Sequence, residues 1–292
     1  MERRQFGKTD MQVSVLGFGG SEIGFGGTAQ SDVEVILNEA LDNGMNVIDT
    51  GECYADSEEK IGKAVGHRRD DYWLFTKCGH TSGLPGEDWE PDMLRKSIDR
   101  SLQRLQTDRL DLIQLHTCSI EVLDRGEAIQ VIQEAKAAGK ARYIGYSGDG
   151  QTMKHALGLG VFDAIQTSVN FADQECIDLT LPLAKAQGLG VIAKRPVANV
   201  AWRHKSGEDA GYGRVYWERL QELKYLYPEM FDACLRFTIS QDIHVAIVGA
   251  SKPERFAENE AIVAKGALDT MTLNWIRNRW KEVAKPDWVG QT

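Results

Sequence analysis

Short apolar runs alternate with longer amphipathic stretches along almost the whole chain. The apolar runs are rich in β-branched, Leu and aromatic residues, which is typical of buried strands. Eight of them stand out: residues 13–19, 46–50, 72–78, 110–116, 141–147, 164–170, 189–195 and 245–250. The pattern therefore predicts eight strands separated by helical segments.

The stretches between the runs have helical periodicity. Residues 31–44 place four apolar side chains on one face, and we expect Ser31 to cap this helix and Gly44 to end it. Residues 91–106 begin with a proline and repeat the pattern, as do residues 127–142. Strands that alternate with helices of this length favour parallel pairing.

Eight strand–helix units in a chain of 292 residues match the size and count of a (β/α)8 TIM barrel. We therefore predict one α/β barrel domain over residues 1–292, with an N-terminal β-hairpin in residues 3–14 that plugs its bottom. A doubly wound sheet is the competing fold. The glycine-rich segment 16–27 does not have the G-x-G-x-x-G spacing of such folds, and we interpret it as a loop at the barrel top, where the backbone passes close to a ligand.

Charge and composition narrow the range of partners. A net charge of −9 argues against nucleic acid or an acidic membrane surface, and no apolar run is long enough to span a bilayer. The first ten residues are polar, so we expect no signal peptide. The five cysteines form no C-x-x-C pair, which favours reduced thiols in a cytoplasmic protein and gives no metal-ligand spacing.

The carboxyl ends of three consecutive predicted strands carry residues with acid–base chemistry. The second strand ends at Asp49 and is followed by Tyr54, the third ends near Lys77, and the fourth ends at His116. Active sites of barrels of this kind lie at these strand ends, so the four side chains are expected on one rim.

Together these four residues suit proton transfer to an oxygen. An ammonium at Lys77 would lower the pKa of Tyr54 and make the phenol a competent proton donor, while Asp49 holds Lys77 in place. His116 would orient a carbonyl oxygen against the phenol. Such a site fits the reduction of a carbonyl group by hydride.

The same residues resemble the catalytic tetrad of the aldo-keto reductase superfamily. The matches are Asp49 and Tyr54 in "VIDTGECY", Lys77 in "FTKCG" and His116 in "DLIQLH", and the resemblance extends from "FGKTDMQVSVLGFGG" to "IVGASKPERFAEN". It implies a barrel that reduces an aldehyde or ketone to an alcohol, reversibly. It also implies a nicotinamide cofactor, NADP(H) with NAD(H) as the alternative, and a small carbonyl or alcohol substrate.

A helix start after the eighth strand suits the cofactor's phosphate, because free backbone N–H groups and the helix dipole favour an anion there. By resemblance, Arg255 holds the adenosine 2′-phosphate, Glu258 and Asn259 approach the adenine, and Ser251 and Lys252 add phosphate contacts. Two further matches would hold the nicotinamide carboxamide, and two cations after the seventh strand could reach the pyrophosphate. These are Ser147, Gln166, Lys194 and Arg195.

The chain departs from the family pattern at three places. Gly148 follows Ser147 where an asparagine is usual, and Asn170 is a possible substitute. Lys194 stands where an aromatic ring often stacks on the nicotinamide, and Gly249 stands where a lysine is common. Preference for NADP consequently depends on Arg255 and Lys252.

Two other functions remain open at this stage: a barrel aldolase with a Schiff base on Lys77, and a nicotinamide-binding regulatory subunit. The loop 197–214, Trp89 and the tail 274–292 are predicted to shape the pocket. The sequence leaves open the substrate, the reaction direction, the oligomeric state and the roles of three rim cysteines, Cys53, Cys78 and Cys118.

Overall fold

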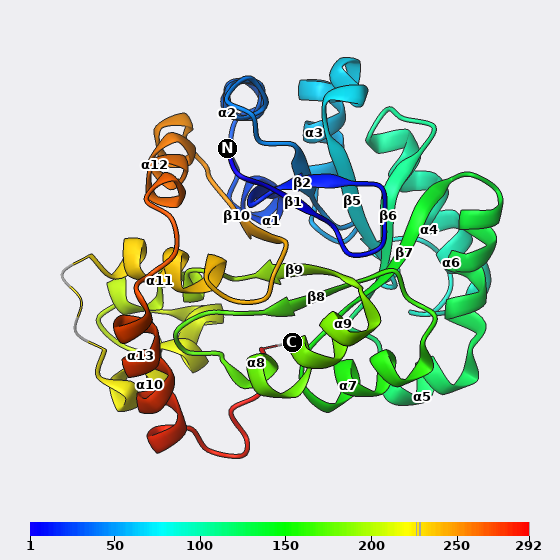
Figure 1. The fold of residues 1–292 in the computed structure, drawn as a ribbon. Coiled ribbons are helices and arrows are strands. Elements are labelled where there is room, and N and C mark those ends of the chain that lie inside the picture. Colours follow the sequence, from blue (N-terminus) through cyan, green and yellow to red (C-terminus); the bar gives the residue numbers. More distant parts are fainter. Residues whose placement is uncertain (226, 228, 292) are drawn as a thin grey trace.

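Eight parallel strands close into a barrel in the computed structural model, which describes residues 1–225, 227 and 229–291 (Figure 1). Around the barrel they follow the order β10, β3, β4, β5, β6, β7, β8, β9. The prediction of a (β/α)8 barrel is confirmed. The strands are β3 (Leu16–Gly19), β4 (Val47–Asp49), β5 (Trp73–Cys78), β6 (Leu110–His116), β7 (Ala141–Ser147), β8 (Ala164–Ser168), β9 (Gly190–Lys194) and β10 (Val245–Val248).

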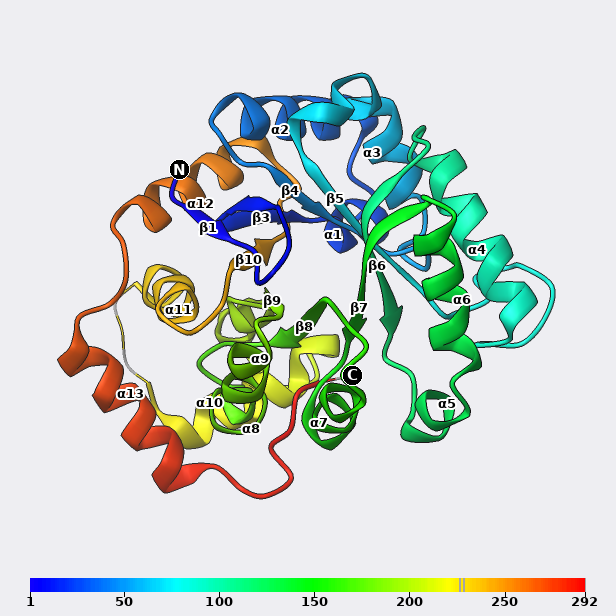
Figure 2. The same ribbon diagram turned by 45° about the vertical axis from the view of Figure 1, so that its right-hand side comes forward.

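Helices surround this barrel as an outer ring, which is most visible in Figure 2. One helix of the ring lies between each pair of consecutive strands, and another follows β10. The ring comprises α2 (Gln30–Asp42), α3 (Ser57–Val65), α4 (Pro91–Arg104), α6 (Glu127–Ala137), α7 (Gly150–Leu159), α9 (Leu181–Gln187), α11 (Met230–Ile239) and α12 (Pro253–Ala264).

Shorter elements lie in the connections. Helices α10 (Arg214–Leu223) and α13 (Thr270–Val283) contribute Tyr216 and Trp280 to a separate apolar cluster that also contains Phe237 of α11. The remaining elements are α1 (Ser21–Phe25), η1 (Gly66–Asp71), α5 (Ile120–Arg125), α8 (Glu175–Leu179), η2 (Ala198–Arg203), η3 (Gly211–Gly213), α10 (Arg214–Leu223) and α13 (Thr270–Val283).

Inside the barrel, an apolar layer lies below a polar one. Side chains two apart on a strand share a face, so Phe75 and Lys77 of β5 both point inward, as do Leu112 and Gln114 of β6. Phe75 and Leu112 belong to the apolar cluster that fills the lower barrel. The buried polar side chains Lys77 and Gln114 lie one layer higher, toward the carboxyl ends of the strands. The alternation within each strand thus builds a polar floor for a site at the top.

The predicted N-terminal hairpin closes the bottom of the barrel. β1 (Arg3–Gln5) and β2 (Gln12–Ser14) pair antiparallel, and the apolar side chains Phe6, Met11 and Val13 are fully buried in the lower cluster. The turn requires Gly7, whose φ is +55° and where a Cβ would lie 2.4 Å from the backbone nitrogen of Gly190. The hairpin therefore acts as a plug.

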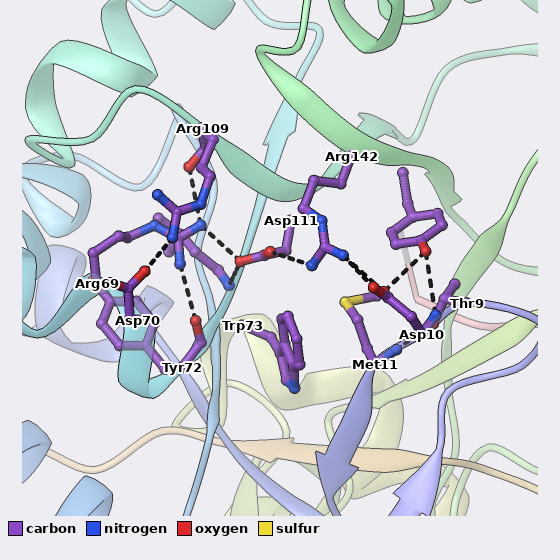
Figure 3. A network of polar contacts seen from close by, with 12 residues as sticks. Thr9, Asp10, Met11, Arg69, Asp70, Tyr72, Trp73, Arg109, Asp111 and Arg142 are labelled. Atoms are coloured by element: carbon purple, nitrogen blue, oxygen red, sulfur yellow. Dashed lines mark hydrogen bonds and ion pairs between the residues drawn. The ribbon is translucent and has the colours of Figure 1, made fainter.

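A network of ion pairs fastens this plug to the barrel (Figure 3). Arg142 of β7 bonds both Asp10 in the hairpin turn, at 2.6 Å, and Asp111 of β6, at 3.1 Å. Asp111 is 2% exposed and also accepts hydrogen bonds from Arg69 Nη2 at 2.7 Å and the backbone N–H of Leu74 at 2.8 Å. All of these charged groups lie away from the carboxyl ends of the strands, so we expect the network to stabilise the fold.

Two local expectations need correction. Residues 13–19 form parts of two strands, because Ser14 ends the hairpin and bonds Asn46 before β3 enters the barrel. Ser31 does not cap its helix: α2 already begins at Gln30, and its N-cap position makes no side-chain hydrogen bond. Gly44 follows the helix end as predicted, with a φ of +94°. The loop 197–214 is ordered, with two short 3-10 helices.

Candidate active site

A buried ion pair lies at the centre of the barrel top. Lys77 Nζ lies 2.5 Å from Asp49 Oδ2 and also donates to the backbone oxygen of Thr50 at 2.7 Å; both charged side chains are 1% exposed. Burial by itself would lower the pKa of Lys77, but Asp49, together with Tyr54 and Cys53, outweighs this effect and the pKa is raised. Lys77 therefore stays an ammonium.

Two amides satisfy the other carboxylate oxygen of Asp49. Gln166 Nε2 donates to Oδ1 at 2.9 Å, and Gln114 Nε2 donates at 3.3 Å. Burial raises the pKa of Asp49, while Lys77 and both amides favour its charged form. Ser147 Oγ donates in turn to Gln166 Oε1 at 3.0 Å. The predicted carboxamide-binding pair thus joins the predicted catalytic ion pair in one buried network.

Tyr54 lies directly above Lys77, whose Nζ is 5.0 Å from the centre of the phenol ring. Glycines allow this close packing. A Cβ on Gly51 would lie 3.2 Å from the ring, and one on Gly24 of α1 would lie 2.1 Å from the carbonyl oxygen of Tyr54. The glycine-rich segment 16–27 was expected to approach a ligand; at Gly24 its close neighbour is the backbone of Tyr54.

The pKa of Tyr54 differs in direction from the sequence-based expectation. Burial raises this pKa, and Asp49 raises it further, whereas Lys77 lowers it. The sum is a raised pKa, so the phenol carries its proton at neutral pH. The expected acidification by Lys77 is present as a contribution, but desolvation outweighs it.

His116 completes the group of four. Its ring packs edge-on to Tyr54, with 5.7 Å between ring centroids, and its Nδ1 lies 3.4 Å from Cys53 Sγ. Burial lowers the pKa of His116 well below its usual range, and the cations Lys77 and Lys194 lower it further. The imidazole is therefore neutral. All four residues predicted as catalytic are brought together at one rim.

Strained backbone conformations cluster at this rim. Ala55, Thr117 and Arg195 have φ values of 48°, 61° and 53°, and each follows a strand end or a predicted site residue. Non-glycine residues adopt this left-handed conformation at a cost of about 1–3 kcal/mol each, and such strain concentrates at functional sites.

Lys194 and Arg195, predicted to reach the cofactor, both lie next to Asp149. Lys194 Nζ is 2.8 Å from Asp149 Oδ2, and Arg195 Nη1 bonds Ser168 Oγ at 2.9 Å. Arg195 also bonds the hydroxyl of Tyr212 in the 197–214 loop. Sequence reasoning missed Asp149, although its place two residues after the β7 strand end was a usable signal.

Gly148 has a steric explanation. A Cβ there would lie 2.6 Å from the ring of Tyr146, which is 1% exposed and donates to the backbone oxygen of Cys118 at 2.9 Å. The usual asparagine therefore has no room. Asn170 does not replace it, because its amide bonds the backbone oxygen of Arg195 and the N–H of Ala172.

The predicted phosphate-binding residues lie around the start of α12, as expected from their position after β10. Arg255 and Glu258 are exposed and form an ion pair of 2.7 Å, while Asn259 is 3% exposed. Ser251 is half-buried and Lys252, at the N-cap position, is exposed. A Cβ on Gly249 would lie 2.8 Å from the carboxylate of Glu22, so a negative charge stands next to the position where a lysine is common.

The residue types fit a nicotinamide dinucleotide. The Ser147–Gln166 pair offers hydroxyl and amide groups suited to a carboxamide. Lys252 is the N-cap residue, and Arg255 lies in the first turn, of a twelve-residue helix whose free N–H groups favour phosphate. Within the described part of the chain, no three His, Cys, Asp or Glu side chains gather as metal ligands would, and no helix is long and apolar enough to cross a membrane.

Comparison with known proteins agrees with this geometry. The sequence profile of the Aldo/keto reductase family matches residues 15–281. This chain belongs to the aldo/keto reductase family. It is accordingly an NAD(P)H-dependent oxidoreductase that reduces an aldehyde or ketone.

Individual aldo/keto reductases and related enzymes cover much of the chain. L-galactose dehydrogenase of Arabidopsis thaliana is 37% identical over 213 residues, which are 68% of this chain and 66% of that enzyme. NADH-specific methylglyoxal reductase of Escherichia coli is 26% identical, over 89% of this chain and 93% of that enzyme. The structure of aldo-keto reductase AKR11C1 from Bacillus halodurans, in its holo form, matches with a TM-score of 0.84 at 28% identity, covering 99% of both chains.

Proposed function

We propose that Tyr54 is the proton donor of the reaction and that Asp49, Lys77 and His116 support it. The observation that carries this proposal is the close approach of three groups. A buried ammonium lies beneath the ring of a protonated phenol, and a neutral imidazole lies beside that ring. A nicotinamide held by this site would supply the hydride. The substrate oxygen gains negative charge as the hydride arrives, and Tyr54 gives it a proton.

Lys77 stabilises the phenolate that Tyr54 becomes after it gives up its proton. Asp49 keeps Lys77 charged and fixed in position, because its second oxygen is anchored by Gln166 and Gln114. A neutral imidazole at His116 can donate an N–H to the substrate oxygen and thereby orient the carbonyl group. Polar groups already fixed in place in this way need not reorganise during the reaction.

The same observations weigh against a Schiff base on Lys77. Such chemistry needs a neutral amine as nucleophile, and Asp49 raises the pKa of Lys77 instead of lowering it. Borohydride reduction in the presence of carbonyl substrates should therefore leave Lys77 unmodified.

For the cofactor we propose a preference for NADPH, held by Arg255 and Lys252 at the start of α12 and by Ser147 and Gln166 at the nicotinamide. Lys194 and Arg195 stand beside Asp149 within reach of the same rim. NADH is the second candidate, because Glu22 places a carboxylate beside Gly249 and one relative is named an NADH-specific enzyme.

A hydroxylated aldehyde, such as an aldose or its open-chain form, is the substrate class we propose. The most similar relative reported above is named L-galactose dehydrogenase. Aromatic rings lie next to the proposed catalytic residues. The ring centroid of Phe25 lies 5.9 Å from that of Tyr54. The ring of His80 packs on Trp89, and its centroid lies 5.3 Å from that of His116. Such rings can pack on the apolar faces of sugars, while His80 and Asp88 offer polar contacts.

The extent of the domain and the location of the protein are two further proposals. We propose that residues 1–292 form a single domain, because one barrel with its plug and ring uses the elements from β1 to α13. A cytoplasmic location is supported by five cysteines that are all free thiols.

A substitution at Tyr54 tests the proposed function. In Tyr54→Phe we expect kcat to fall at least about a hundredfold while the affinity for NADPH changes less than about twofold, because the ring stays but the proton is lost. Tyr143→Phe is the matched control, since its hydroxyl bonds Asp10 at the barrel bottom. Turnover by Tyr54→Phe close to that of the unsubstituted enzyme would contradict the proposal.

The cofactor preference needs its own measurement. A spectrophotometric screen of aldoses, aldehydes and ketones against NADPH, NADH and their oxidised forms would give the substrate class and direction. In Arg255→Ala we expect KM for NADPH to rise at least about tenfold and KM for NADH to change less than about twofold, since only the former carries a 2′-phosphate. Equal effects on both cofactors would point to NADH.

A further inference from the structure

Cys53 is the immediate neighbour of Tyr54, and the mechanism above gives it no role. Its side chain forms a hydrogen bond, because Sγ lies 3.4 Å from His116 Nδ1. Among the described residues this is the one hydrogen bond of the His116 ring. The partner of Nδ1 decides which ring nitrogen carries the proton, and therefore what the ring offers to a substrate.

We propose that Cys53 is a positioning residue whose S–H donates to His116 Nδ1 and thereby keeps the proton of the ring on Nε2. This inference rests on the proposed function, in which His116 donates an N–H to the substrate oxygen. With Nδ1 occupied as an acceptor, Nε2–H remains as the donor. The opposite arrangement, Nδ1–H donating to sulfur, would turn the Nε2 lone pair toward the substrate oxygen and repel it.

Protonation states support this direction of the hydrogen bond. Burial raises the pKa of the Cys53 thiol to about 11, with Lys77 opposing and Glu52 and Glu58 adding to the rise, so the S–H proton is present at neutral pH. His116 is neutral for the reasons given above and so carries a single N–H. Of the two possible bonds, S–H to an imidazole nitrogen is favoured, because a ring nitrogen accepts well whereas thiol sulfur accepts weakly.

The surroundings of His116 leave this role to Cys53. His80, which faces the ring at 5.3 Å, bonds Asp88 through its own Nδ1. Three cations also act on the pKa of His116, namely Lys77, Lys194 and Arg195, and none of them can accept a hydrogen bond from its ring in the charged form. A half-buried imidazole without a fixed partner at Nδ1 would populate both tautomers.

The tautomer can be observed directly by ¹⁵N NMR of protein with labelled histidine, with the His116 signals assigned through a His116→Asn variant. We expect the unsubstituted protein at neutral pH to show a protonated Nε2 and an unprotonated Nδ1. A protonated Nδ1 in the unsubstituted protein would overturn the proposal without the need for any variant at Cys53.

Two substitutions of similar size separate hydrogen bonding from packing. Cys53→Ala removes the donor, so we expect a mixture of tautomers, a raised His116 pKa and a kcat/KM that falls by about tenfold. Cys53→Ser keeps a donor and should recover most of the tautomer preference and activity. Equal behaviour of Ala and Ser would overturn the proposal. Cys118→Ala, which changes a nearby thiol, should leave the His116 tautomer unchanged.

The outcome can be separated from that of the proposed function. Loss of activity in Tyr54→Phe tests the proton donor whatever happens at Cys53. If His116→Asn keeps full activity, the role of His116 in the proposed function fails. If His116→Asn is inactive while Cys53→Ala keeps both activity and tautomer, only the inference about Cys53 fails.

Discussion

Glu58 offers a quantitative test of the burial around the rim that carries the proposed catalytic residues. It lies in the first turn of α3, is 1% exposed, and accepts a hydrogen bond of 2.7 Å from Thr76 Oγ1, next to Lys77 in the sequence. The nearest cation, Arg104, is 3.8 Å from Oε2, an oxygen without a hydrogen-bond partner in the described chain. Glu58→Gln keeps the shape and the Thr76 contact but removes the ionisable group.

The pH dependence of this substitution has a definite sign. Burial raises the pKa of Glu58 from its ordinary value of 4.5 to about 7. Between these values the folded state holds a proton that the unfolded chain has lost, so the free energy of unfolding decreases as pH rises. Each pKa unit is worth about 1.4 kcal/mol, so the full cost above pH 7 is about 3 kcal/mol. From pH 5 to pH 8 it grows by about 2.5 kcal/mol.

Urea denaturation followed by far-UV circular dichroism at pH 5 and pH 8 measures this cost. The free energy of unfolding of Glu58→Gln, minus that of the unsubstituted protein, should increase by about 2.5 kcal/mol across this range. All other titrating groups contribute to both proteins and cancel. Glu59→Gln, an exposed neighbour on α3, should change the difference by less than about 0.5 kcal/mol. A difference for Glu58→Gln that is independent of pH would refute the reasoning.

Three further substitutions test particular contacts. Asp111→Ala should lower the free energy of unfolding in urea by about 3–5 kcal/mol, because it leaves Arg69 without its buried partner. Gly148→Ala should cost about 1–3 kcal/mol in the same assay, since its Cβ would lie 2.6 Å from the Tyr146 ring. Gly24→Ala should displace the backbone of Tyr54 and lower kcat at least about tenfold. Gly158→Ala is its steric control, because Gly158 lies in helix α7 with open space around its Cβ position and without a positive φ. An unchanged kcat in Gly24→Ala would contradict the close approach.

The arrangement of the barrel was predictable because it depends on local patterns. Eight apolar runs separated by amphipathic stretches are sufficient to predict parallel strands with an outer ring of helices. Inward and outward faces follow from the two-residue period of a strand, which is why Phe75 and Lys77 share a face. Errors arose at element ends such as Ser31, where the residue that caps a helix depends on how the chain enters it.

The four candidate catalytic residues could be predicted for a related reason. They lie at the carboxyl ends of consecutive strands, and a closed parallel barrel brings these ends to one rim. Their electrostatics could not be predicted in the same way. The sequence suggested that Lys77 lowers the pKa of Tyr54, yet the net direction is upward, because desolvation depends on every atom packed around the phenol.

The sequence by itself determined the order of strands and helices, the family resemblance and the identity of the rim residues, since these depend on periodicity and spacing along the chain. Only the tertiary structure decided which side chains meet. It placed Asp149 beside Lys194, Tyr146 against Gly148 and Cys53 against His116, pairs that are separated by 45, 2 and 63 positions. Except at Gly148, the two residues of each pair come from different strand–helix units of the barrel. Their closeness in space therefore cannot be predicted from their spacing along the sequence.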